Sequence, residues 1–204
     1  RMDAYNSLAN FGYNHPEYTY PGLSEDPSLV MEASGLAHPL IFEEVVTNDF
    51  RIERGNFIVI TGANMAGKST FLRSVALAIL MSNAGLPVSA TYMAYTPIPL
   101  ISSMRTSDSL SRQESYFFAE LKRLKKIVDH LEGGPYFVVL DEILKGTNSK
   151  DKAKGSREFL ERLLSMRATG LIATHDLSLC EVADELGAVH NYFIDAQIRD
   201  GELY

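Results

Sequence analysis

The sequence contains one cysteine, Cys180, and no tryptophan among its 204 residues. A single cysteine excludes an intrachain disulfide and fits a reducing compartment, so we expect a cytoplasmic location. We interpret Cys180 as a small buried apolar residue rather than a nucleophile. No apolar run approaches the roughly 20 residues that cross a bilayer. An N-terminal signal pattern is also lacking, so we expect no membrane contact by this chain.

An excess of positive charge is lacking too. Lys and Arg number 19 against 26 Asp and Glu, which gives a formal net charge of −7. Nucleic-acid surfaces need clustered Lys and Arg, so any DNA contact is expected from segments outside this chain. The basic run 122–126 is flanked by acidic residues and reads as a solvated helix face. The chain begins at Arg1 without a methionine, so we expect a fragment or a processed form of one or two domains.

A glycine-bounded loop is the most informative feature that is present. The spacing Gly-x4-Gly-Lys-Ser occurs between an apolar run at 57–61 and a second one at 70–80, which predicts strand, loop and helix. Backbone N–H groups and the helix N-terminus of such a loop wrap a phosphate chain. Lys68 is expected to reach the β- and γ-phosphates, and the Ser69 hydroxyl to ligate Mg²⁺. The alternative is a glycine-rich turn that binds nothing. The predicted nucleotide-binding residues are Gly62, Ala63, Asn64, Met65, Ala66, Gly67, Lys68, Ser69 and Thr70. For Asn64, two roles stay open: hydrogen bonding to nucleotide, or tolerance of the loop conformation.

Two further apolar runs, 136–140 and 170–174, predict strands buried on both faces. They alternate with helical patterns, which favours an α/β fold with a mostly parallel sheet flanked by helices. Strand-like segments at 29–33 and 45–52 predict a small antiparallel β layer ahead of it. Ligands of parallel sheets bind at the carboxyl ends of the strands. The loop after Thr61, the pair Asp141-Glu142 and His175 all follow strands at such ends.

These strand-end residues match the needs of phosphoryl transfer. Asp141 is expected to hold Mg²⁺ together with Ser69, and Glu142 to orient and deprotonate the attacking water. Alone, an Asp-Glu pair could equally mark a helix start or a polar strand end. His175 is expected beside the γ-phosphate as a sensor. Its alternative is a helix N-cap, a role that Thr174 or Asp176 could fill instead.

The same residues resemble the ATPase domain of the MutS mismatch-repair family. The Asn-Met pair inside Thr61–Thr70 is the most telling likeness, and the resemblance extends from about residue 28 to the end. The other matching segments are Asp141–Ser149, Ala173–His175 and the signature segment Asp108–Glu120, which contains Ser115 and Phe117. Residues 1–12 would be the last stretch of a lever helix. The implied division is 1–27 as lever helix and linker, and 28–204 as an ABC-type ATPase domain.

The resemblance implies more than the spacing does. ATP would bind with Mg²⁺ at a composite interface of a homodimer or of related subunits, with Ser115 of one subunit facing the γ-phosphate held by the other. DNA-binding and mismatch-reading domains would precede residue 1. A dimer-stabilising segment would follow Tyr204.

Several positions depart from the family pattern and indicate a divergent, MutS-related protein. Ala66 and Lys152 stand where the family has glycine, and Leu144-Lys145 replace Gly-Arg. Val45 falls near the position of an adenine-stacking aromatic residue. Gln113-Glu114 and Tyr116 replace Gly-Arg and Thr around Ser115.

Three functions follow as hypotheses. The leading one is a Mg²⁺-dependent ATPase module, with Lys68, Glu142 and His175 as catalytic residues, coupled to DNA mismatch repair or other DNA handling. An ATP-binding subunit of a membrane transporter is suggested by a faint echo in 110–113, where the expected Gly-Gly is missing. A nucleotide switch with little turnover is suggested by the altered signature segment.

Overall fold

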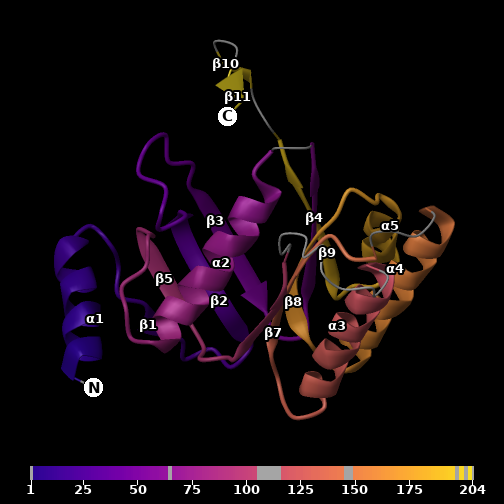
Figure 1. Cartoon of the computed structure of the whole chain (residues 1–204), viewed down its shortest axis with the longest axis horizontal. Coiled ribbons are helices and arrows are strands. Elements are labelled where there is room, and N and C mark those ends of the chain that lie inside the picture. The colour runs from indigo at the N-terminus through magenta and orange to yellow at the C-terminus, as the bar shows by residue number, and fades with distance from the viewer. Residues whose placement is uncertain are drawn as a thin grey trace. The chain divides into compact units, whose positions relative to one another are not determined.

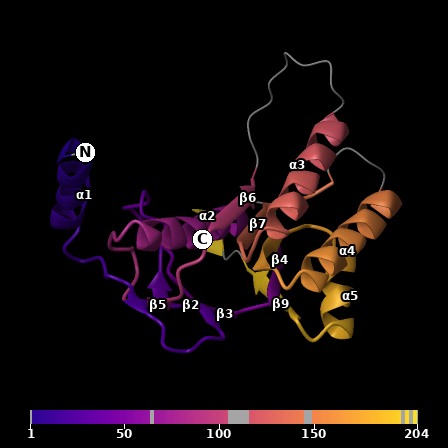
Figure 2. The ribbon, with the colours of Figure 1, turned by 90° about the horizontal axis from the view of Figure 1, so that it is seen from below.

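The computed structural model describes residues 2–63, 66–104, 116–144, 149–195, 198–199 and 202–203. The chain divides into two compact units (Figures 1 and 2). The first, unit 1, comprises Arg1–Glu53 and Thr70–Ile98, and the second, unit 2, comprises Arg54–Ser69 and Pro99–Tyr204. The predicted boundary between residues 27 and 28 remains a prediction.

Unit 1 contains a helix and a four-stranded sheet. The helix α1 (Met2–Asn14) buries none of its residues. The sheet has the order β1-β5-β2-β3, formed by β1 (Gly22–Leu23), β5 (Tyr92–Tyr95), β2 (Leu29–Leu36) and β3 (Asn48–Glu53). β2 is antiparallel to both neighbours, as the sequence predicts, but β1 pairs with β5 in parallel. The layer is therefore mixed, because the dipeptide Gly22–Leu23 supplies an extra strand parallel to β5.

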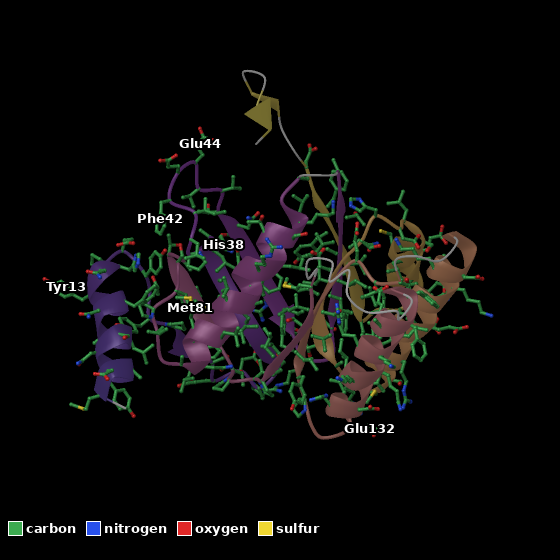
Figure 3. All side chains as sticks on the ribbon, in the orientation of Figure 1. Tyr13, His38, Phe42, Glu44, Met81 and Glu132 are labelled. Carbon is green, nitrogen blue, oxygen red and sulfur yellow. The ribbon has the colours of Figure 1, made fainter. Side chains whose placement is uncertain are left out.

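The segment between β2 and β3 leaves apolar side chains in solvent. Leu40 is 72% exposed, Phe42 69% and Val46 63%. Figure 3 labels Phe42 and Glu44 on this segment, and the Phe42 ring stacks on His15 with 6.4 Å between centroids. The segment also contains Val45, at the place where the family resemblance expects an aromatic residue.

Unit 2 is built on a five-stranded parallel sheet of order β6-β7-β8-β4-β9. Its strands are β4 (Phe57–Gly62), β6 (Leu100–Ser103), β7 (Phe137–Asp141), β8 (Thr169–Ala173) and β9 (Val189–Ile194). Every residue of β7 and β8 is buried, as expected for unbroken apolar strands inside a parallel sheet. The predicted α/β class with a parallel sheet is thereby confirmed.

Three helices cover this sheet from one side (Figure 2). They are α3 (Tyr116–Leu131), α4 (Ser149–Ser165) and α5 (Ser178–Glu185). Each contributes apolar side chains to one buried cluster with the strands: Leu124 and Ile127 from α3, Leu160 and Leu163 from α4, and Leu179 and Val182 from α5. The cluster fixes the helices against the sheet and so fixes the loops that leave the strand ends.

The remaining elements are short or shared. The helix α2 (Lys68–Asn83) begins in unit 2 and continues from Thr70 in unit 1. A two-stranded antiparallel hairpin is formed by β10 (Ile198–Arg199) and β11 (Glu202–Leu203). No helix within the described ranges has both the length and the apolar character needed to cross a membrane.

Candidate nucleotide-binding site

The three polar segments singled out from the sequence lie at the carboxyl ends of three adjacent strands, β7, β8 and β4. Backbone hydrogen bonds tie these ends together. The Glu142 N–H donates to the Ala173 carbonyl (2.9 Å), and the Thr174 N–H donates to the Ile60 carbonyl (3.0 Å). The residues after each strand therefore meet at a single edge of the sheet, as the strand-end rule for α/β proteins requires.

The loop after β4 depends on glycine at its first position. Gly62 has φ +149°, and a Cβ placed there would lie 2.2 Å from the Ile194 carbonyl oxygen of β9. No side chain fits at that separation. Gly67, the second glycine of the motif, has φ +87° with open space around it. Its role is conformational freedom at the start of α2.

Lys68 is folded back onto the loop. Its Nζ donates to the carbonyl oxygens of Gly62 (2.9 Å) and Ala63 (2.7 Å), and the residue is only 7% exposed. Burial lowers the pKa of Lys68, while the nearby carboxylates of Glu142 and Asp141 oppose that change. The ammonium group is thus a desolvated cation, for which phosphate oxygens would be stronger acceptors than two carbonyls.

Ser69 and Asp141 form a direct pair. The Ser69 Oγ donates to Asp141 Oδ2 at 2.8 Å, and Asp141 is buried at 8% exposure. Mg²⁺ prefers hard oxygen ligands and keeps several waters and phosphate oxygens, so one hydroxyl and one carboxylate suit it. Within the described ranges, His, Cys, Asp and Glu do not gather in groups of three or more that could hold a metal. The donor set fits magnesium held mainly by nucleotide and water.

Glu142 and His175 form a second pair, with 2.8 Å between Glu142 Oε1 and His175 Nε2. The Glu142 side chain is 14% exposed and that of His175 38%. Glu142 has φ +49° and Leu144 has φ +56°, a left-handed conformation that costs a non-glycine residue about 1–2 kcal/mol. The hydrogen bond from the Glu142 N–H to β8 and the side-chain contact with His175 help to hold this backbone in place.

The turn after β8 is stabilised by Thr174 and Asp176 and not by the His175 side chain. Asp176 Oδ1 accepts hydrogen bonds from the Ser178 N–H (3.0 Å) and the Ser178 Oγ (2.7 Å). Thr174 Oγ1 accepts one from the Asp176 N–H (3.0 Å). Thr174 and Asp176 therefore organise the entry to α5, and the His175 ring contacts Glu142 instead. The Asp-x-Ser spacing is a turn signal that can be recognised in the sequence.

Asn64, Met65 and Ser115 lie outside the described residues, so their predicted contacts stay predictions. Thr70, half-buried in the first turn of α2, accepts a hydrogen bond on its carbonyl from Ser74 Oγ. Ala66 donates its N–H to the Ala63 carbonyl (3.3 Å). The roles of all these residues toward a nucleotide stay predictions.

The parallel sheet, its flanking helices and the small mixed sheet define a P-loop ATPase fold. Residues 58–204 match the family profile described as MutS domain V. The chain belongs to the MutS family, and the matched region is that family's ATPase domain.

Individual relatives agree with this assignment. The chain is 32% identical over 212 residues to the DNA mismatch repair protein MutS of Methanosarcina mazei. The aligned region covers 99% of this chain and 23% of that protein. It is 33% identical over 210 residues to DNA mismatch repair protein MutS 1 of Halobacterium salinarum, with 99% and 23% covered. It is 32% identical over 154 residues to human MutS protein homolog 4, with 75% and 16% covered. The chain spans less than a quarter of the length of these relatives.

Proposed function

We propose that this chain is a Mg²⁺-dependent ATPase module of a MutS-like DNA mismatch-repair or DNA-handling protein. The observation that carries the proposal is the meeting of Lys68, the Ser69–Asp141 pair and the Glu142–His175 pair at one edge of the parallel sheet. Phosphoryl transfer to water requires a cation, two oxygen atoms that can ligate a metal, and a carboxylate paired with an imidazole.

Each residue has a defined task in this mechanism. Lys68 leaves the carbonyls of Gly62 and Ala63 and binds the β- and γ-phosphates, while the loop N–H groups and the start of α2 add positive potential. Ser69 and Asp141 would hold Mg²⁺, and the bound ion would supply neutralisation of the developing phosphate charge. Glu142 orients the attacking water and accepts its proton on the side-chain carboxylate. His175 positions the Glu142 carboxylate through Nε2 and lies beside the γ-phosphate as a sensor.

The wider biological setting is also proposed, on the family resemblance. ATP would lie at a composite interface of a homodimer or of related subunits, with Ser115 acting in trans. DNA would be held by other parts of the protein, since this chain carries net negative charge. The departures at Ala66, Val45 and the signature segment support a divergent member of the family. The cytoplasmic location stays a prediction.

The second candidate is a nucleotide switch with little turnover, favoured by the departures around Ser115. A transporter subunit is not favoured, because this chain is similar to DNA mismatch repair proteins. Single-turnover hydrolysis by the full-length protein separates ATPase from switch. Tight ATP binding without phosphate release would favour the switch.

The decisive variant is Glu142→Gln in the full-length protein. We expect phosphate release to fall at least about a hundredfold, since the general base is lost, while binding of a fluorescent ATP analogue changes little. Glu158→Gln, which alters an exposed carboxylate on α4, is the matched control and should turn over ATP normally. Normal turnover in Glu142→Gln would remove that residue from the mechanism.

A further inference from the structure

Two residues of unit 2 are unfavourable for the backbone conformation at their own positions. Leu144 has φ +56°, a conformation that suits glycine and disfavours a bulky side chain. Gly155 lies in the middle of α4, where glycine is the least favourable residue after proline. Local propensity explains neither choice, so an explanation must come from what the two side-chain positions contact.

The two positions meet in space. A Cβ added at Gly155 would lie 2.7 Å from Leu144 Cδ1, well inside the roughly 3.5–4.0 Å at which carbon atoms pack. Leu144 is 5% exposed and belongs to the buried cluster that includes Leu160 and Leu163 of α4. The missing side chain of Gly155 therefore provides the space that Leu144 occupies.

We propose that Leu144 and Gly155 form a knob-and-hole lock that positions Glu142. The inference rests on the proposed role of Glu142 in ATP hydrolysis. Leu144 follows Glu142 by two residues, and Ile143 between them is 1% exposed in the same cluster. With Leu144 seated against α4 and the Glu142 N–H bonded to β8, the backbone is held on both sides of the Glu142 side chain. The left-handed conformation at 142 and 144 is kept by packing on α4.

The lock is tested first by its energetics, using hydrogen exchange in the full-length protein without nucleotide. Alanine favours helix over glycine, so Gly155→Ala alone should slow exchange in α4 if nothing contacts the new methyl group. In the otherwise wild-type protein, which keeps Leu144, we expect the opposite result. Gly155→Ala should make exchange in 137–144 and 151–163 about tenfold faster, because the methyl group displaces Leu144.

The companion measurement uses Leu144→Ala as the background. With the knob removed, adding Gly155→Ala should slow exchange in α4, since only helix propensity is left. A reversal of sign between the two backgrounds supports the lock. Slower exchange in both backgrounds would overturn it. Lys154→Ala, at an adjacent exposed position of α4, is the control and should change neither segment.

The positioning role is tested by steady-state ATP hydrolysis. Gly155→Ala should lower kcat by about threefold to a hundredfold while KM for ATP stays within about twofold, because the nucleotide-binding groups are untouched and only Glu142 shifts. Combining it with Leu144→Met should restore most of kcat, since the unbranched side chain can avoid the new methyl group. Equal losses in kcat with and without Leu144→Met would overturn the positioning role.

The two proposals fail separately. Normal turnover in Glu142→Gln would end the catalytic role of Glu142 and leave the exchange results standing. Exchange of the same sign in both backgrounds would end the lock and leave the ATPase proposal standing.

Discussion

Each charged or proposed metal-binding side chain of the site has a partner within the protein. Lys68 binds two loop carbonyls, Ser69 binds Asp141, and Glu142 binds His175. A nucleotide with Mg²⁺ must therefore replace the Lys68 and Ser69 contacts with its own, and its affinity reflects the difference between the bonds lost and the bonds gained. Lys68 contributes most clearly to this difference, because the burial of its ammonium group lowers its pKa.

The lowered pKa of Lys68 predicts a pH dependence of stability. The folded protein disfavours the charged lysine relative to the unfolded chain, so its penalty is present below the folded-state pKa. The penalty is relieved as pH rises through that pKa toward the unfolded value. We expect Lys68→Met to raise the thermal midpoint of the nucleotide-free protein at pH 7, with a smaller gain near pH 10.

The control for this measurement is Lys154→Met, which removes a lysine whose side chain is 78% exposed. It should leave the midpoint unchanged at both pH values. A lower midpoint for Lys68→Met at pH 7 would mean that the bonds to the Gly62 and Ala63 carbonyls outweigh desolvation. Circular dichroism melting of the full-length variants gives the comparison.

At the scale of elements, the pairing of β4 with β9 depends on one missing side chain. The register sets Gly62 opposite Ile194, and a Cβ at 62 would meet the Ile194 carbonyl oxygen at 2.2 Å. We expect Gly62→Ala to weaken this pairing by about 2–4 kcal/mol, from overpacking and an unfavourable φ. Hydrogen exchange of β4 and β9 amides measures the loss.

Gly55→Ala is the control for a positive φ without a close contact to the new side chain. Gly55 also has a positive φ, +76°, but nothing lies within 4 Å of an added Cβ. It should cost only about 1 kcal/mol. Equal costs at positions 55 and 62 would show that strain, and not contact with β9, sets the need for glycine at 62.

The strands and the site residues differ in how far the sequence predicts them. The apolar runs before Asp141 and His175 are long and unbroken, so β7 and β8 were predictable as buried strands. The positions of Lys68, Asp141, Glu142 and His175 at one sheet edge followed from topology. The parallel partner of β1 and the left-handed Leu144 were not predictable, because both depend on contacts between distant segments and run against local propensity.

At the scale of the whole molecule, the proposed composite site predicts association driven by ATP. Full-length Glu142→Gln should accumulate as an ATP-bound dimer, because it binds nucleotide without releasing phosphate. Lys68→Ala, which loses the phosphate-binding cation, should not respond to ATP. Sedimentation velocity with and without ATP and Mg²⁺ provides the readout. Equal sedimentation of Glu142→Gln in both conditions would argue against a nucleotide-bridged dimer.

The contact between Leu144 and Gly155 also constrains the history of this sequence. A Cβ at position 155 would lie 2.7 Å from Leu144 Cδ1, so any side chain at 155 requires Leu144 to shift. Glycine at 155 removes the need for that shift, although it weakens the helix. Among related sequences, bulky residues at 144 should therefore be found with glycine at 155, and an ancestor reconstructed with leucine at 144 and a bulky 155 should fold poorly.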